Sequence, residues 1–368
     1  MNEVSQRLLK MLHQRSAQLE DGDPISPPLV TTAKYRLAPA PGTEFTYGRE
    51  SNPTVMEVEA AIGALEAAEC VAFPSGMAAI TGALMACACK GDRVLVPLDG
   101  YYTIRLLLED FLTEMGLEIV TAKTQDYAAM DLTGFDLVWI ETPSNPGLDV
   151  CDIAEITAHA HAAGAKVVVD NTSATPFLQQ PLDLGADMSV CSDTKAMSGH
   201  SDLLFGHVAS RDTDLLAKAR SWRKLSGSVA GPFEAFLVHR GLMTLELRLD
   251  RMCQTAQALA NIFVQSNKLD RVRFPGLPSD PSFALSQKQM LKPGFVIGLY
   301  FETEALAEQF IAGCPLIFPS TSFGGVHTSA ERRARWGDDV PAGFVRLSVG
   351  CEPEALLLAA MKEALDAL

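Results

Sequence analysis

The sequence contains no apolar run long enough to cross a bilayer, and its N-terminus lacks the apolar core of a secretory signal. Residues 1–20 mix charged with apolar positions, a pattern that predicts an amphipathic helix instead. The acidic residues Glu3, Glu20 and Asp21 also count against an organelle transit peptide, since such peptides are poor in acids. We therefore expect a cytoplasmic protein that does not insert into a membrane.

Positive charge is also in short supply. The chain has 30 Lys and Arg against 45 Asp and Glu, which gives a formal net charge of -15. An acidic protein repels the phosphates of nucleic acids and of anionic lipids. We expect no nucleic-acid partner, although a local basic site could still bind a small anionic substrate.

The cysteines form no C-x-x-C pair. Most of the eight thiols lie in apolar stretches, which favours buried, reduced side chains over disulfides. Cys87 and Cys89 lie two positions apart, but no cluster of histidine or cysteine accompanies them. The sequence therefore predicts no metal site.

What the sequence does contain is a dense group of chemistry-bearing residues between positions 166 and 202. Val167–Val169 is a short apolar run that ends in Asp170, and a second run at 188–191 is followed by Ser-Asp-Thr-Lys at 192–195. Short apolar runs bounded by turn residues are typical of buried strands in parallel sheets. Since ligands bind beyond the carboxyl ends of such strands, we expect the two strand ends to form one site.

This set of side chains suits pyridoxal phosphate. That cofactor needs a lysine for its Schiff base, a carboxylate beside its ring nitrogen and donors around its phosphate. Lys195 and Asp170 would fill the first two roles, and the hydroxyls of Ser192 and Thr194 the third. A single Asp or Lys at a strand end is usually only solvated, but the combination on two strands is much less expected by chance.

The segments DNTSATPFLQQPLDLGAD and CSDTKAMSGHSD closely resemble the cystathionine gamma-synthase and gamma-lyase family of pyridoxal-phosphate enzymes, which handle cysteine and methionine. The resemblance covers roughly residues 45–352. It implies an α/β protein with the aspartate-aminotransferase-like fold (fold type I), with a mostly parallel seven-stranded sheet domain and a smaller α/β C-terminal domain. We place an N-terminal helix and arm at 1–46, the PLP-binding large domain at 47–232 and the C-terminal domain at 233–368.

Periodicity and turn residues predict further elements. Strands are expected at 93–97, 137–140, 203–209 and 295–301, and helices at 55–67, 153–163, 211–225, 233–266 and 305–312. Residues 22–46 are rich in proline and lack periodicity, which predicts an extended arm.

The resemblance assigns this arm and the residues after it to contacts between subunits. In the family such an arm reaches a neighbouring subunit, and a Tyr-x-Arg pair contacts the cofactor phosphate of the adjacent one. Tyr47 and Arg49 match that pair, although Ser51 replaces the family's usual glycine. The resemblance thus implies a homotetramer, built as a dimer of dimers with shared active sites.

Further cofactor contacts follow from the resemblance. Gly76 and Met77 match a turn that cradles the phosphate at a helix N-terminus, which is a natural anion site. Asn145 matches an asparagine that approaches the cofactor's phenolic oxygen and the substrate. Tyr101 matches the tyrosine that stacks on the ring and acts in proton transfer, with Tyr102 as the alternative because the loop is one residue shorter.

Arg346 stands in an otherwise apolar segment, where an unpaired cation is costly. It needs an anion, either an internal carboxylate or one from a ligand, and the resemblance favours the α-carboxylate of a substrate. Ser322 would position that carboxylate or Lys195. Phe323 and His327 depart from the family pattern at positions that could set side-chain specificity.

The resemblance implies catalysis by Lys195 and Tyr101. Our leading hypothesis is γ-elimination on cystathionine or a related sulfur amino acid, giving cysteine, 2-oxobutanoate and ammonia. A γ-synthase-type replacement on an O-acylhomoserine comes second, and a methionine γ-lyase or C–S β-lyase third. A catalytically idle cofactor-binding protein would be expected to lack Lys195 or Asp170, yet both are present.

Overall fold

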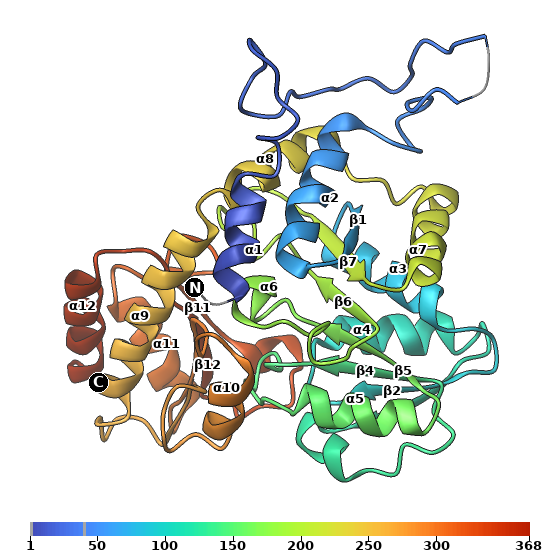
Figure 1. The fold of residues 1–368 in the computed structure, drawn as a ribbon. Helices are drawn as coiled ribbons and strands as arrows, with labels where there is room; N and C mark the ends of the chain where they lie inside the picture. The colour runs from blue at the N-terminus through green and yellow to red at the C-terminus, as the bar shows by residue number, and fades with distance from the viewer. Residues whose placement is uncertain (1–2, 40–41) are drawn as a thin grey trace.

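The computed structural model describes residues 3–39 and 42–368, and it contains two β-sheets with helices around them (Figure 1). The larger sheet has seven strands in the order β1-β7-β6-β5-β4-β2-β3. Its strands are β1 (Glu69–Phe73), β2 (Arg93–Pro97), β3 (Glu118–Ala122), β4 (Leu137–Glu141), β5 (Lys166–Asp170), β6 (Met188–Cys191) and β7 (Gly206–Ser210). Only β7 runs antiparallel to its neighbours among these strands, so the predicted mostly parallel, seven-stranded sheet is confirmed.

Helices cover both faces of this sheet, which explains why its strands are apolar on both sides. On one face lie α3 (Gly76–Cys87), α4 (Tyr102–Leu107), the π-helix η1 (Leu108–Leu112) and α7 (Thr213–Ser226). On the other lie the 3₁₀-helix η2 (Thr124–Ala129) and α5 (Ile153–Ala162). Val168 packs toward the first group, whereas Val167 and Val169 pack toward the second, since successive strand residues point to opposite faces.

The smaller sheet has five strands in the order β10-β11-β12-β9-β8. They are β8 (Arg271–Arg273), β9 (Val296–Tyr300), β10 (Phe318–Pro319), β11 (Ser329–Arg332) and β12 (Phe344–Ser348). The apolar sides of α9 (Leu245–Phe263), α11 (Glu304–Gly313) and α12 (Glu354–Asp366) form one core with this sheet. The short helices α10 (Phe283–Gln289) and η3 (Arg333–Trp336) complete this part, which confirms the smaller α/β C-terminal unit.

The N-terminal segment begins with the predicted helix, α1 (Glu3–Leu12), which packs against α2 (Pro53–Glu66). Between them, residues 13–39 and 42–50 contain no helix or strand, and most of their side chains are exposed. Figure 1 shows this arm in blue, extending away from the body of the chain. The short α6 (Thr175–Leu178) follows β5, and α8 (Pro232–Leu242) packs against α2.

The structure corrects one predicted helix. The segment 233–266 forms two helices, α8 and α9, because Thr244 leaves the helical conformation with φ -121° and ψ 14°. Arg248 explains the break, since its guanidinium donates to the carbonyl oxygens of Ala196 (2.7 Å), Met197 (3.0 Å) and Gly241 (2.8 Å). These contacts with the loop after Lys195 override the helical periodicity. Strands β1, β3, β8, β10 and β11 were not predicted from the sequence.

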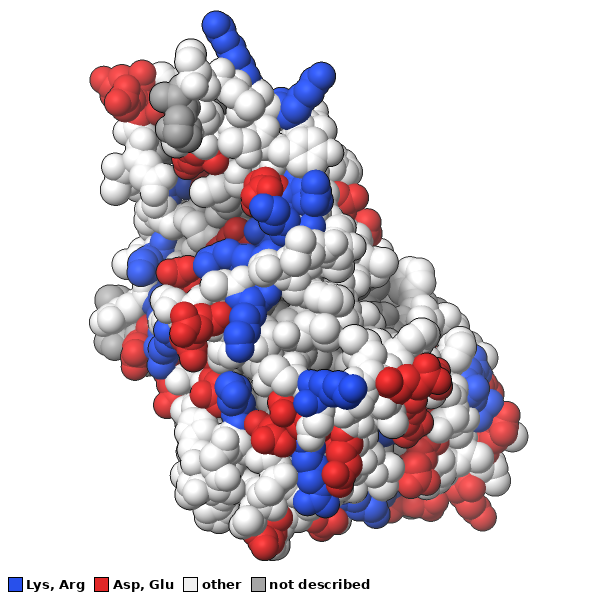
Figure 2. Space-filling model, turned by 90° about the vertical axis from the view of Figure 1, so that its right-hand side faces the viewer, with Lys and Arg blue, Asp and Glu red and all other residues white. Residues whose placement is uncertain are grey.

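The surface agrees with the charge balance of the sequence. On the face shown in Figure 2, basic and acidic side chains are interspersed over the body of the protein. Within residues 3–39 and 42–368, no helix combines the length and the apolar character that a membrane span requires.

Candidate active site

The strand ends that carry the predicted chemistry meet at one rim of the large sheet. Asp170 closes β5 and pairs in register with Val190 of β6, and the turn 192–195 follows β6 directly. Asp170, Ser192, Thr194 and Lys195 all line one cavity of about 420 Å³. The expected convergence is therefore present.

Most of the other predicted site residues line the same cavity. The wall includes the predicted residues Gly76, Met77, Tyr101, Asn145, Ser322 and Arg346. Tyr47 and Arg49 lie elsewhere: the Tyr47 side chain is 47% exposed, and Arg49 donates to the carbonyl oxygen of Lys224 at 3.2 Å. Their assignment to a neighbouring subunit's site stays a prediction.

Lys195 is held at the junction of the two sheets. Its Nζ donates to Oγ of Ser322 at 2.5 Å and lies 5.4 Å from the ring centroid of Phe323. Burial and the positive charge of Arg346 lower the pKa of Lys195 to about 8, against the opposing effect of Glu331. At pH 7 a pKa of about 8 leaves roughly a tenth of this amine uncharged, far more than for an ordinary lysine, and the uncharged form is the one that acts as a nucleophile or a base.

Ser322 adopts an unusual backbone conformation, with φ 79°. A residue other than glycine is seldom found in this left-handed region, and such residues often occur at functional sites. The conformation directs the hydroxyl of Ser322 to Lys195 and leaves its carbonyl oxygen to accept from Nη2 of Arg346 at 3.0 Å. Ser322 thus contacts both predicted reactive groups.

Two buried carboxyl groups lie side by side at the sheet rim. Glu141 at the end of β4 pairs in register with Asp170. Burial raises the pKa of both groups, and the charge of Asp170 raises that of Glu141 further. The two Glu141 oxygens accept from the backbone N–H groups of Tyr101 (2.6 Å) and Asn145 (2.7 Å). Glu141 therefore holds two cavity loops in position, a role that our sequence analysis did not assign to it.

Asp170 has a different environment. Its Oδ1 accepts from the backbone N–H of Thr172 at 3.0 Å, but within the described chain no side-chain cation is bonded to it. Buried carboxylates are costly without a cationic partner. Asp170 is consequently suited to a cationic group of a ligand in the cavity.

The N-terminus of α3 faces the same cavity. Oγ of Ser75 caps the helix by accepting from the N–H of Ala78 at 3.1 Å, whereas the N–H groups of Gly76 and Met77 precede the first intrahelical bonds. A Cβ on Gly76 would lie 2.5 Å from Cβ and Oγ of Ser192, so only glycine permits this close approach. The corner combines backbone donors with a hydroxyl, an arrangement that binds anions.

The hydroxyl of Thr194 is less available to a ligand than expected. Its Oγ1 accepts from the N–H of Phe205 at 2.9 Å and donates to the carbonyl oxygen of Phe205 at 3.1 Å. A hydroxyl has one proton to donate. Thr194 can therefore donate to a ligand only if its bond to the Phe205 carbonyl is broken.

Arg346 is buried in the cavity wall. Its charge is paired with a carboxylate of the chain itself, which is one of the two alternatives that the sequence left open. Nη2 donates to Oε1 of Glu331 at 2.5 Å, and Nη1 donates to Oδ1 of Asn145. Burial and the nearby Arg333 lower the pKa of Arg346 to about 10, so it stays charged. Nε is buried without a partner in the described chain. The contacts with Asn145, Ser322 and Glu331 use three of the five N–H groups, so the Nε–H and one N–H of Nη1 remain for a ligand.

The structure distinguishes the two tyrosines of the shortened loop. Tyr101 lies on the cavity wall, whereas Tyr102 begins α4. Their rings meet edge to face with centroids 5.6 Å apart. The position of Tyr101 favours it as the tyrosine that would cover a bound ring.

A buried ionic cluster lies behind the lysine turn. His207 of β7 contacts Oδ1 of Asp193 through Nδ1 at 2.8 Å and Oε1 of Glu66 through Nε2 at 3.2 Å, and all three side chains are fully buried. Burial opposes the charged imidazole, but Asp193 and Glu66 outweigh it and raise the pKa of His207 to about 10. The cluster ties the turn 192–195 to β7 and α2.

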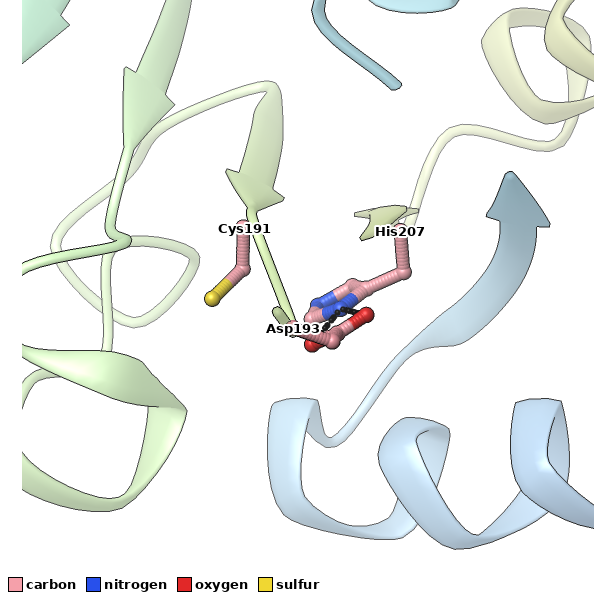
Figure 3. Close-up of side chains that lie close together, drawn as sticks. All are labelled: Cys191, Asp193 and His207. Carbon is pink, nitrogen blue, oxygen red and sulfur yellow. Dashed lines mark hydrogen bonds and ion pairs between the residues drawn. The ribbon is translucent and has the colours of Figure 1, made fainter. Parts of the chain in front are cut away.

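Cys191 lies near enough to this cluster for the group to be considered as a metal site. Figure 3 shows the Cys191 sulfur directed away from the contact between Asp193 and His207. Both imidazole nitrogens already face carboxylates, and burial raises the thiol pKa of Cys191 well above its usual value. The geometry favours a structural ion network over metal coordination.

Several wall residues were not foreseen. They are Ser75, Ile80, Glu141, Thr172, Ser173, Leu204, Thr321 and Arg333. The sequence pattern could have identified Glu141 as a wall residue, since it ends a predicted strand in the same way as Asp170 does. The sequence pattern did not distinguish Arg333 as a site residue, because a charge-rich stretch such as 331–335 resembles an ordinary solvated surface.

Comparison with known proteins adds independent findings. The profile of the family described as "Cys/Met metabolism PLP-dependent enzyme" matches residues 10–366. A Streptomyces coelicolor protein that carries the provisional name cystathionine gamma-lyase is 46% identical over 94% of this chain and 89% of its own.

Solved structures are similar over almost their whole length. An apo methionine gamma-lyase from Micromonospora echinospora superposes with a TM-score of 0.91 and 36% identity, covering 99% of both chains. A cystathionine gamma-synthase from Xanthomonas oryzae in complex with cystathionine has a TM-score of 0.91 and 30% identity, covering 98% of this chain and 97% of the other.

Proposed function

Because this chain belongs to the family of Cys/Met metabolism enzymes that depend on pyridoxal phosphate, we propose that it is a γ-lyase that cleaves cystathionine. As a family member it carries out elimination or replacement at the γ-carbon of sulfur amino acids. The observation that carries the proposal is the convergence of Lys195, Asp170 and Arg346 on one cavity. The 46% identity to the Streptomyces protein supports elimination and cystathionine as the substrate.

The cavity fits pyridoxal phosphate on three counts. Lys195 would hold the aldehyde, the uncompensated carboxylate of Asp170 would pair with the ring nitrogen, and the α3 N-terminus with Ser192 would hold the phosphate. When bound, the cofactor supplies an aldehyde that condenses with amines and a protonated ring that accepts electrons from the α-carbon. Tyr101 would cover the ring, and Asn145 would approach its phenolic oxygen.

Lys195 is the group that moves protons in this proposal. With the cofactor bound, the uncharged amine of Lys195 would take the proton from the α-carbon of the substrate. The pKa of about 8, lowered from 10.5, makes the uncharged amine much more available near neutral pH than in an ordinary lysine. The hydroxyl of Ser322, 2.5 Å from Nζ, keeps the amine inside the cavity while it is free.

Arg346 orients the substrate. Its unpartnered Nε would donate to the α-carboxylate, while Asn145, Ser322 and Glu331 hold the rest of the guanidinium in place. Fixing the carboxylate fixes the direction of the bond from the α-carbon to its hydrogen, and therefore its distance from Lys195. The ring of Phe323 lies near both groups, with its centroid 5.1 Å from the Arg346 guanidinium carbon and 5.4 Å from Nζ of Lys195.

The overall reaction balances with one water. Cystathionine and water give cysteine, 2-oxobutanoate and ammonia, as the γ-carbon–sulfur bond breaks and the sulfur takes a proton. Tyr101 lines the same cavity, its loop is fixed through the bond from its N–H to Glu141, and its phenol would serve as the second proton-transfer group. Lys195 and Tyr101 are the two catalytic residues of the proposal.

One experiment tests this reaction directly. The purified, cofactor-loaded protein is incubated with cystathionine, and 2-oxobutanoate and free thiol are measured over time. We expect both products in equal amounts. Absence of 2-oxobutanoate from cystathionine, together with its release from methionine, would replace the proposal by a methionine γ-lyase. Pyruvate as the product would instead indicate a C–S β-lyase.

A γ-synthase is the second candidate, because the Xanthomonas synthase with cystathionine bound shares this fold almost completely. A synthase would form cystathionine from an O-acylhomoserine and cysteine. Mixing these two compounds with the protein and measuring cystathionine against 2-oxobutanoate decides between the two activities.

The assembly is part of the same proposal. The exposed arm would lie on a neighbouring subunit and bring Tyr47 and Arg49 to the phosphate of that subunit's cofactor. A homotetramer made of two such dimers, located in the cytoplasm, is the form that we propose. The boundaries at 46/47 and 232/233 remain our proposed division of each chain into arm, large domain and C-terminal domain.

A further inference from the structure

A second guanidinium lies in the wall of the active-site cavity. Arg333, at the start of η3, lines the same cavity as Arg346 and is only 4% exposed. An arginine buried to this extent is rare unless it is paired, and its position in a ligand cavity calls for an explanation.

Two carboxylates fix the orientation of Arg333. Its Nη1 donates to Oε1 of Glu331 at 2.8 Å, and its Nε donates to Oδ2 of Asp338 at 2.6 Å, with Nη2 also 2.6 Å from that oxygen. Glu331 is itself held by Trp336, whose Nε1 donates to Oε2 at 2.8 Å. The guanidinium is therefore rigid.

The two carboxylates that hold Arg333 are not part of the wall of the active-site cavity. Among the described residues the cavity wall includes Arg333 and Arg346, whereas Asp338 lines a separate hollow and Glu331 belongs to neither wall. A guanidinium has five N–H donors, and the contacts above engage three of those on Arg333. The remaining donors are those that can serve a ligand.

Glu331 also brings the two arginines close together. Its Oε1 accepts from Nη2 of Arg346 at 2.5 Å as well as from Nη1 of Arg333 at 2.8 Å. Two positive groups bonded to one oxygen atom are near enough to be reached by one small molecule with two negative ends. The positive charge of Arg333 acts on a group inside the cavity, since it helps to lower the pKa of Lys195.

We propose that Arg333 is a specificity-determining residue that binds a second carboxylate, at the far end of the substrate's side chain. The inference rests on the proposed function, in which Arg346 holds the α-carboxylate. It names the preferred substrate class as amino acids that carry a distal carboxylate, in preference to those with an apolar side chain of the same length. Planar, two-donor recognition of a carboxylate is what an arginine supplies and a lysine does not.

A purely structural role makes a different prediction. If Arg333 only held Glu331 and Arg346 in place, its loss would weaken the binding of every amino acid to a similar degree. A contact with a distal carboxylate affects only ligands that possess one. A matched pair of ligands therefore separates the two roles.

The test uses L-2-aminoadipate and L-norleucine, which have six carbons each and differ by a terminal carboxylate in place of a methyl group. Neither carries a leaving group at the γ-carbon. Their dissociation constants are measured on the cofactor-loaded protein from the change in its visible absorbance. We expect wild type to bind 2-aminoadipate more tightly, and Arg333→Met to weaken that ligand about ten- to hundredfold with norleucine changed less than about twofold.

Two further variants complete the design. Arg333→Lys keeps the charge and should restore part of the preference for 2-aminoadipate. Arg332→Met is the matched control, because Arg332 is the adjacent buried arginine but bonds to Glu308 (2.7 Å) and Glu304 (2.5 Å) on α11. Its preference between the two ligands should equal that of wild type.

Two outcomes overturn the inference: equal affinity of wild type for the two ligands, or an equal loss for both ligands in Arg333→Met. The first requires no variant and so holds even if a variant fails to fold. Since neither ligand undergoes cleavage, a preference for 2-aminoadipate without cystathionine cleavage would reject the proposed reaction alone. Cleavage without that preference would reject this inference alone.

Discussion

Nζ of Lys195 and Oγ of Ser322 lie 2.5 Å apart, although the two residues are separated by more than a hundred positions in the chain. Lys195 follows β6 of the large sheet, and Ser322 precedes β11 of the small one. The bond therefore spans the junction between the two sheets, and the active-site cavity lies at that junction. Any change in how the sheets meet alters the surroundings of the amine.

Replacing Lys195 by Ala should abolish covalent retention of the cofactor. After borohydride reduction and denaturation, wild type should keep a covalently attached cofactor that absorbs in the near ultraviolet, whereas the variant should keep none. The variant should also lose activity by more than about a thousandfold, because the nucleophile and the base are the same amine. Lys166→Ala, which changes an exposed lysine on β5, is the control. A reducible chromophore that remains attached to Lys195→Ala would contradict the assignment.

The lowered pKa of Lys195 predicts a pH dependence for cofactor incorporation into the apoprotein. Only the uncharged amine reacts with an aldehyde, so the rate should rise with pH and level off above about 8, in place of the ordinary lysine value of 10.5. Stopped-flow absorbance after mixing with pyridoxal phosphate measures this rate. A rate that is still climbing steeply at pH 10 would show that the amine is not perturbed.

Arg346→Lys should raise KM for every amino-acid substrate about ten- to hundredfold, since a lysine cannot reproduce the donor at Nε. The protein should still fold, because Arg333, Trp336 and Thr321 continue to bond to Glu331. Steady-state kinetics and a thermal melt check the two parts. An unchanged KM in a well-folded variant would remove Arg346 from carboxylate binding.

Arg49→Ala should weaken cofactor retention although Arg49 lies outside its own chain's cavity. If Arg49 serves a neighbour, then mixing and refolding Arg49→Ala with Lys195→Ala should restore part of the activity, since one site in a mixed dimer has both native residues. Activity assays on the mixture measure this, with each variant alone as the control. Mixtures as inactive as their components would place the whole site within one chain.

His207 predicts a loss of stability at high pH. Its pKa rises from 6.5 to about 10 on folding, so its contribution is complete below pH 6.5 and disappears as the pH rises through about 10. His207→Leu should lower the free energy of unfolding near pH 7 by about 3–5 kcal/mol, because Asp193 and Glu66 lose their shared cation.

Denaturant unfolding at pH 7 and pH 9.5 measures this effect. His161→Leu is the control, since His161 pairs with Asp187 at 2.9 Å but is largely exposed and should cost less than about 1 kcal/mol. Equal stability of wild type at the two pH values, or an unaffected His207→Leu, would show that the buried imidazole is not charged.

The strand-end reasoning succeeded where the local sequence determines the position of a side chain. Asp170 and Lys195 had to meet, because parallel strands bring their carboxyl ends to one rim, and the observed register of β5 and β6 does so. The resemblance favoured Tyr101 but left Tyr102 as an alternative, since both follow the same strand, and the course of the loop in the structure separates them.

The rest depended on contacts between distant segments. Arg248 ends α8 by bonding to carbonyl oxygens about fifty positions earlier, which no local periodicity can indicate. The sequence did not identify the partner of Arg346. Glu331 lies on the neighbouring strand β11, and neither segment by itself indicates that β11 pairs with β12. His207 and Asp193 likewise become partners only through the pairing of β6 with β7.

The bonds from Arg248 to the carbonyl oxygens of Ala196 and Met197 join the first turns of α9 to the loop that follows Lys195. This helix of 19 residues begins beside the loop after the reactive lysine and ends in the core of the smaller sheet. The core of the smaller sheet thereby supports the backbone directly after Lys195, although the two lie at opposite ends of this helix.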